Sequence, residues 1–266
     1  MKRFFLIISA ATLILPVACH KVATNNSNSN YTPTPIEAPE GAVDLGLSVY
    51  WAECNLGASA PELSGDYYAW GETETHYTTL EPLSWKSGYA DHGYWWQTYS
   101  LCTYTSSGDV VINKYKWNLS GYGSVSWGSA DFLAELQRQE KEGETMDDVA
   151  RARLGQRWRM PTADEFTELI ENCTVEPKTL HGEWGYQFTS KKSGFEGASI
   201  FLPACGYLTS SLQNASGNNI SGLYWTASLD KDNPRQALEM VFTKNTAPKL
   251  FQDVRCRGQL IRPVAK

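Results

Sequence analysis

Five short runs in the C-terminal half of the 266-residue chain, in which apolar and polar residues alternate, constrain the fold most strongly. Alternation with a period of two is typical of β-strands that bury one face. Glycine- and asparagine-rich stretches, which favour turns, separate the runs. We therefore predict short antiparallel strands at 186–190, 199–203, 223–227, 237–242 and 249–255.

A helix with clear start signals precedes these strands. Thr162 and Glu165 have the spacing of a capping box, in which each side chain accepts a backbone N–H of the other residue. Pro161 disfavours extension of this helix towards the N-terminus. The apolar residues that follow at helical spacing share one face: Phe166, Leu169, Ile170 and Cys173. Further helices are predicted at 130–142 and 147–154, so the chain belongs to the α+β class.

The N-terminus has the features of an export signal. Lys2 and Arg3 precede an apolar run, 4–15, which is too short to span a bilayer comfortably. Small residues then lead to Ala18 and Cys19, an arrangement that resembles a bacterial lipoprotein signal, in which the cysteine is lipidated. An ordinary secretory signal that is cleaved nearby is the alternative.

Three regions follow from this pattern. We predict a lipoprotein signal peptide over 1–19, with lipidation at Cys19, and a flexible tether over 20–39, where Asn, Ser and Pro dominate. The remaining residues, 40–266, are long enough for one large domain. The lipid would attach the chain to a membrane.

Five motifs, which occur in order along the domain, are similar to those of a known family. They lie at 65–74, 158–166, 199–207, 224–228 and 261–264. Over 43–264 the chain resembles the Fibrobacter succinogenes major paralogous domain family, which abounds in Bacteroides-type bacteria and is distantly similar to the C-type lectin-like fold of formylglycine-generating enzymes. The resemblance implies a C-type lectin-like fold with short antiparallel strands and two or three helices. It also implies a secreted context, and together with the lipoprotein-like signal we predict an outer membrane lipoprotein, on either face of that membrane.

The resemblance leaves an enzymatic alternative open. Formylglycine-generating enzymes act through a neighbouring pair of cysteines, whereas Cys256 stands alone in its stretch of sequence. A non-enzymatic module is therefore the preferred interpretation, and a divergent enzyme of that type is the alternative. The five cysteines other than Cys19 would permit one or two disulfides in an oxidising envelope.

Aromatic residues outside the family motifs are the candidate ligand contacts. Trp85 and the consecutive rings of Tyr94, Trp95 and Trp96 lie in an irregular, aromatic-rich insertion. Exposed rings beside polar groups suit sugar recognition, because the C–H face of a pyranose stacks on an aromatic ring. The alternative is that the insertion folds back and buries its own rings. A polar turn supplies the other candidates, which are Gln213, Asn214, Asn218 and Asn219.

Other functional classes find little support in the sequence. The net charge of −6 disfavours a protein that binds nucleic acid through its phosphates. Glu72, Glu74 and His76 would share one face of an extended strand as three metal ligands, but a surface role is equally plausible, and we predict no metal or cofactor. No nucleophile motif is present, so we predict no catalytic residues. The preferred function is binding or adhesion, with a glycan or a surface protein as the partner; a structural surface component is a further alternative.

Overall fold

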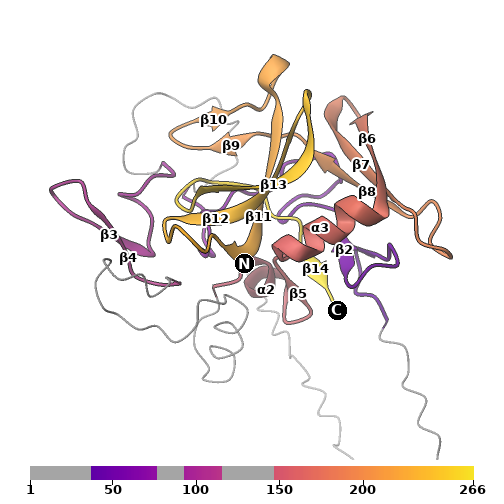
Figure 1. Cartoon of the computed structure of the whole chain (residues 1–266), viewed down its shortest axis with the longest axis horizontal. Coiled ribbons are helices and arrows are strands. Elements are labelled where there is room, and N and C mark those ends of the chain that lie inside the picture. The colour runs from indigo at the N-terminus through magenta and orange to yellow at the C-terminus, as the bar shows by residue number, and fades with distance from the viewer. Residues whose placement is uncertain (1–36, 77–92, 116–146) are drawn as a thin grey trace, which may run out of the picture. The chain divides into compact units, whose positions relative to one another are not determined.

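The computed structural model describes residues 37–76, 93–115 and 147–266, and within these ranges antiparallel strands in small sheets predominate (Figure 1). No helix among these residues is long and apolar enough to cross a membrane. The described strands and helices are consistent with the predicted α+β class and equally with a mainly β fold. The predicted helix at 130–142 lies outside the described residues.

All five predicted runs contain strands, and together with one strand that was not predicted, β6, they form two three-stranded sheets. The first sheet has the order β6-β7-β8 and the second has the order β11-β12-β13. The strands are β6 (Cys173–Leu180), β7 (Glu183–Ser190), β8 (Ser199–Pro203), β11 (Ser221–Leu229), β12 (Gln236–Thr243) and β13 (Thr246–Val254). The sequence did not predict β6, because Pro177 interrupts it. A proline is tolerated there since β6 is an edge strand of its sheet.

A four-stranded sheet joins the two ends of the described domain. Its order is β1-β2-β14-β5, and every pairing is antiparallel. Val264 pairs with both Trp51 and Arg159, so the last strand lies between an early strand and the strand that precedes the main helix. The strands are β1 (Ala42–Val43), β2 (Tyr50–Ala52), β5 (Trp158–Arg159) and β14 (Val264–Ala265).

Two short hairpins complete the described strands. One joins β3 (Cys102–Tyr104) to β4 (Val110–Ile112), and the other joins β9 (Tyr207–Leu208) to β10 (Leu212–Gln213). One turn of 3₁₀-helix, Gly217–Asn219, follows the second hairpin.

The main helix, α3 (Ala163–Asn172), starts as the sequence predicts. The Thr162 side chain accepts from the Glu165 amide, and the Glu165 carboxylate accepts from the Thr162 amide, at 3.2 and 2.8 Å. The apolar stripe faces the core, where Phe166 and Leu169 are fully buried. Cys173 is also buried, but it is extended and starts β6 instead of continuing the helix.

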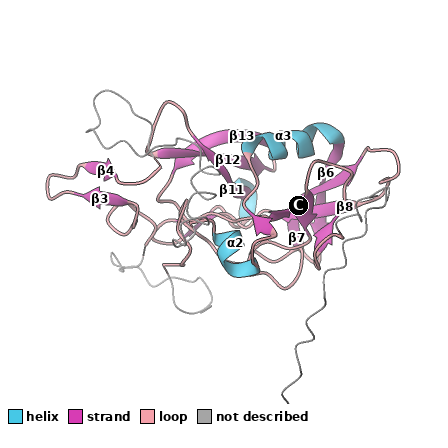
Figure 2. Ribbon diagram, turned by 90° about the horizontal axis from the view of Figure 1, so that it is seen from below, coloured by secondary structure: helices cyan, strands magenta, loops and turns pink. Residues whose placement is uncertain are grey.

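The second helix, α2 (Val149–Leu154), is also confirmed (Figure 2). Asp148 caps it by accepting from the Arg151 amide at 3.1 Å, and Gly155 ends it at a φ of 91°. The same buried carboxylate accepts from the Met160 amide at 2.9 Å, which ties α2 to the residue after β5. Burial raises the pKa of Asp148, although these amides oppose the shift.

Two fully buried arginines connect distant parts of the chain, and both bind mainly neutral oxygens. Arg262 donates to the side-chain oxygen of Asn55 and to three backbone carbonyl oxygens, those of Ala52, Glu53 and Phe201. Arg255 donates to the Tyr99 hydroxyl and to the carbonyl oxygens of Lys114, Tyr115 and Pro234. Buried donors and acceptors need such partners, so these contacts tie strands and loops that are distant in sequence to one another.

The five cysteines of the described domain are free thiols, so the disulfides that the sequence would permit are not formed in this structure.

Candidate functional site

Three of the four predicted aromatic ligand contacts lie on a segment, 93–99, which is hydrogen-bonded to the β9–β10 hairpin. The Tyr94 amide donates to the carbonyl oxygen of Thr209 at 2.9 Å. Because Gln213 ends that hairpin, this contact brings together two regions that the sequence proposed separately. Trp85 lies outside the described residues.

Tyr94 itself is a core residue, so its prediction as a ligand contact was wrong. Its side chain is only 3% exposed, and its hydroxyl donates to the carbonyl oxygen of Tyr67. Its ring packs against Gly258, where a Cβ atom would come within 2.9 Å of the ring. The absence of a side chain at Gly258 therefore makes the space in which Tyr94 is buried.

Trp95 and Trp96 are both partly exposed. The Trp95 indole packs over Gly93, since a Cβ atom on that glycine would lie 2.3 Å from the ring. Trp96 packs partly against the core and meets Tyr99 edge to face, with the ring centroids 5.7 Å apart. The two indoles therefore combine fixed positions with some exposed area, as stacking on a ligand requires.

The hairpin places polar groups beside this segment. Gln213 pairs with Tyr207, and Leu212 pairs with Leu208. Directly paired residues point to the same face of a two-stranded sheet, so Tyr207 and Gln213 face away from the side of the buried Leu208. Gln213 donates to the Ser211 hydroxyl at 2.7 Å, which orients its amide group.

The other predicted turn residues are exposed. Asn214 adopts a left-handed conformation with a φ of 52°, and its carbonyl oxygen accepts from the Ser221 amide at 2.9 Å. Asn218 and Asn219 lie in the 3₁₀ turn with their side chains exposed. Exposed amide side chains such as these suit contact with solvent and contact with a polar ligand equally well.

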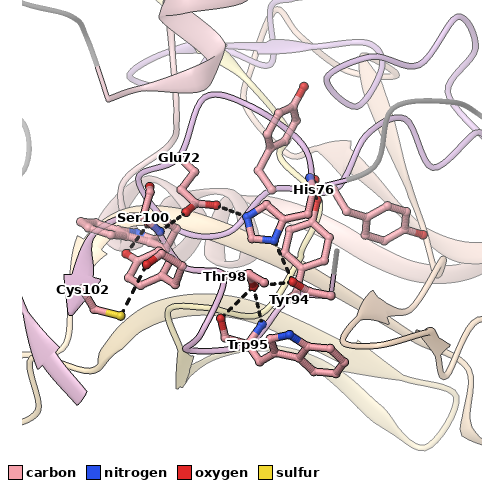
Figure 3. A network of polar contacts seen from close by, with 12 residues as sticks. Glu72, His76, Tyr94, Trp95, Thr98, Ser100 and Cys102 are labelled. Atoms are coloured by element: carbon pink, nitrogen blue, oxygen red, sulfur yellow. Dashed lines mark hydrogen bonds and ion pairs between the residues drawn. The ribbon is translucent and has the colours of Figure 1, made fainter. Parts of the chain in front are cut away.

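A polar network holds the aromatic segment in place (Figure 3). The Glu72 carboxylate accepts from the Ser100 amide at 2.6 Å through one oxygen and contacts Nε2 of His76 at 2.6 Å through the other. The other ring nitrogen of His76, Nδ1, lies 2.8 Å from the carbonyl oxygen of Gly93. The imidazole also stacks on Tyr94, with ring centroids 4.3 Å apart and planes 2° apart.

Glu74 does not join Glu72 and His76, so the three-ligand metal arrangement considered from the sequence does not form. Its side chain is 83% exposed and pairs with Arg153 at 2.9 Å. Among the described residues no group of three or more His, Cys, Asp or Glu side chains is arranged to hold a metal ion. Two of the three side chains considered as ligands, Glu72 and His76, do contact each other, but they support the aromatic segment instead of binding a metal ion.

The contacts of this network indicate a structural role. Both nitrogens of His76 are engaged, so neither is available to accept a proton from a substrate. The nearby Cys102 thiol donates to the carbonyl oxygen of Trp96 at 3.2 Å, and burial raises its pKa, which disfavours the reactive thiolate. The arrangement fixes the position of the 93–102 segment and does not activate a nucleophile.

A hollow of about 310 Å³ lies elsewhere, beside β2 and β14. Asp44, Ser48, Tyr50, Phe195 and Lys266 are among its lining residues, and none of the predicted ligand contacts within the described residues borders it. Ser48 is already engaged, because its hydroxyl donates to Glu168 at 2.5 Å.

The fold and the site therefore define a protein of mostly antiparallel strands with a partly exposed aromatic segment held against a polar hairpin. Comparisons with protein-family models, with curated proteins and with solved structures found no match to this chain.

Proposed function

We propose that this protein is a non-enzymatic binding or adhesion module for glycans. Trp95 and Trp96 would supply stacking surfaces, and Gln213, with Asn214, Asn218 and Asn219 in the adjoining turn, would supply hydrogen bonds. The observation that carries the proposal is the 2.9 Å hydrogen bond from the Tyr94 amide to Thr209, because it holds the indole segment against the hairpin that ends at Gln213.

The combination suits a sugar on physical grounds. An aromatic ring offers a rigid apolar face with little loss of conformational entropy, and the amide groups offer both donors and acceptors. Ligand sites commonly combine apolar walls with a few fixed polar groups. Mainly antiparallel strands with a helix packed against them are also compatible with the C-type lectin-like fold, which we retain as part of the proposal together with membership of the Fibrobacter succinogenes major paralogous domain family.

A formylglycine-generating activity gains no support from the site chemistry. Cys256 is buried, and burial raises the pKa of its thiol to about 12. A thiol in that state is a poor nucleophile at neutral pH.

A glycan array that is probed with the full-length protein tests the proposal. We expect binding to a restricted set of oligosaccharides. If no array member binds, while the same protein captures a defined surface protein from whole cells, the partner is a protein and the glycan proposal fails.

We also propose that a lipid on Cys19 anchors the protein in the outer membrane. Cys19→Ala should move the protein from the membrane fraction to the soluble fraction, because the residue that carries the lipid would be lost. Fractionation followed by immunoblotting measures this. Membrane partitioning that is unchanged in the variant would contradict the anchor.

A further inference from the structure

His76 lies between two hydrogen-bond acceptors, one at each ring nitrogen. A neutral imidazole carries one N–H and one lone pair. If the proton is on Nε2, the Nδ1 lone pair faces the Gly93 carbonyl oxygen at 2.8 Å; if it is on Nδ1, the Nε2 lone pair faces the Glu72 carboxylate at 2.6 Å. Only the imidazolium donates to both.

The surroundings favour that charged form. Burial alone would lower the pKa of His76, but the hydrogen bond and charge of Glu72, together with the Gly93 carbonyl, outweigh burial and raise it. The ring also lies flat on Tyr94 at 4.3 Å, where a cation is attracted to the aromatic face. Glu72 is the charged partner of His76, and the phenol of Tyr94 is the titratable group that stacks on it.

The contact at Gly93 connects His76 to Trp95. The carbonyl oxygen of Gly93 accepts from His76 and also from the Thr98 hydroxyl, at 2.8 and 2.5 Å. The Trp95 indole lies directly over the same glycine, and the Trp95 amide lies 3.4 Å from the Thr98 hydroxyl. A movement of Gly93 therefore changes the support of the indole.

We propose that His76 is a proton-dependent latch, which fixes Trp95 and thereby sets the affinity of the aromatic surface; the affinity part rests on the proposed glycan function. Because the pKa of His76 is raised in the folded state, the latch is complete at low pH. It is released as the pH rises through that pKa, above the usual value of about 6.5. Ligand affinity should fall over the same range.

NMR titration of the full-length protein tests the latch without any ligand. The ring nitrogens of His76 and the indole N–H of Trp95, assigned with Trp95→Phe, are followed over pH 5–9. We expect both signals to shift with one midpoint above about 6.5. In Glu72→Gln, which removes the carboxylate charge and keeps an acceptor oxygen, both midpoints should move to lower pH.

Two controls separate the latch from a general effect of pH. His181→Gln removes a histidine whose side chain is 73% exposed, so it should leave the Trp95 titration unchanged, whereas His76→Gln should abolish it. Glu239 also titrates in this range, since burial raises its pKa to about 8, and its ionisation would weaken the fold as the pH rises. Glu239→Gln should therefore preserve the Trp95 midpoint. A Trp95 signal that stays constant while His76 titrates, or that keeps its midpoint in His76→Gln, would overturn the latch.

The affinity of an oligosaccharide found on the array completes the test. Its dissociation constant should rise at least about fivefold across the His76 midpoint, the lower range of typical coupling between sites. A dissociation constant that depends on Trp95 but not on pH overturns the regulatory role and leaves the glycan function intact. If no oligosaccharide binds, the proposed function fails, while a joint titration of His76 and Trp95 still supports the latch.

Discussion

Arg262→Met should reduce the free energy of unfolding by about 3 kcal/mol or more. The variant removes a fully buried guanidinium but leaves its acceptor oxygens on Ala52, Glu53, Asn55 and Phe201 without donors. Each buried polar group that loses its partner costs about 1–3 kcal/mol. Methionine fills much of the volume, so the loss would reflect hydrogen bonding more than packing.

Urea denaturation followed by circular dichroism measures this loss. Arg153→Met is the matched control, because its side chain is 45% exposed and pairs with the exposed Glu74. Such surface pairs contribute about 0–1 kcal/mol. Equal losses for the two variants would show that the Arg262 contacts do not hold the domain together.

Phe166→Ala should reduce the free energy of unfolding by about 3–5 kcal/mol. The ring is fully buried on α3 and packs against Trp51 of β2, with the ring centroids 4.9 Å apart. Its removal would leave a cavity where the helix meets the sheet that joins both ends of the domain.

Thr162→Ala provides the comparison within the same helix. It removes the hydroxyl that accepts from the Glu165 amide at 3.2 Å. The free energy of unfolding should fall by about 1 kcal/mol. Thermal or chemical unfolding of both variants gives the difference. A cost below about 1 kcal/mol for Phe166→Ala, or equal costs for the two, would contradict a buried helix face.

Features that depend on neighbouring residues were predictable from the sequence. The capping box at Thr162 and Glu165 and the alternating runs in β7 and β8 set local conformation directly, and they appear at the predicted positions. Strand β6 was missed because its only clear signal, Pro177, normally indicates a break. Its edge position, which makes that proline tolerable, is a property of the assembled sheet.

Features of the site that depend on distant residues were not predictable. Tyr94 is buried because Gly258, far along the chain, leaves room for its ring. Arg255 and Arg262 are buried although arginine is mostly exposed in proteins, because separate strands and loops bring carbonyl groups to them. Glu72 and His76 are close in sequence, so their contact was predictable. Their support of the aromatic segment was not, because it depends on the contact between the other ring nitrogen of His76 and the carbonyl oxygen of Gly93.

The affinity of Trp95→Ala for an oligosaccharide from the array tests the central claim most directly. Calorimetric titration is combined with a melting curve, so that affinity is expressed per folded molecule. Leu63→Ala, which truncates an exposed apolar residue, is the control. We predict that Trp95→Ala weakens binding by about 2 kcal/mol, which is the size of an interface hot spot, with little change in melting temperature. Unchanged affinity per folded molecule, or loss of the fold in Trp95→Ala, would contradict the account.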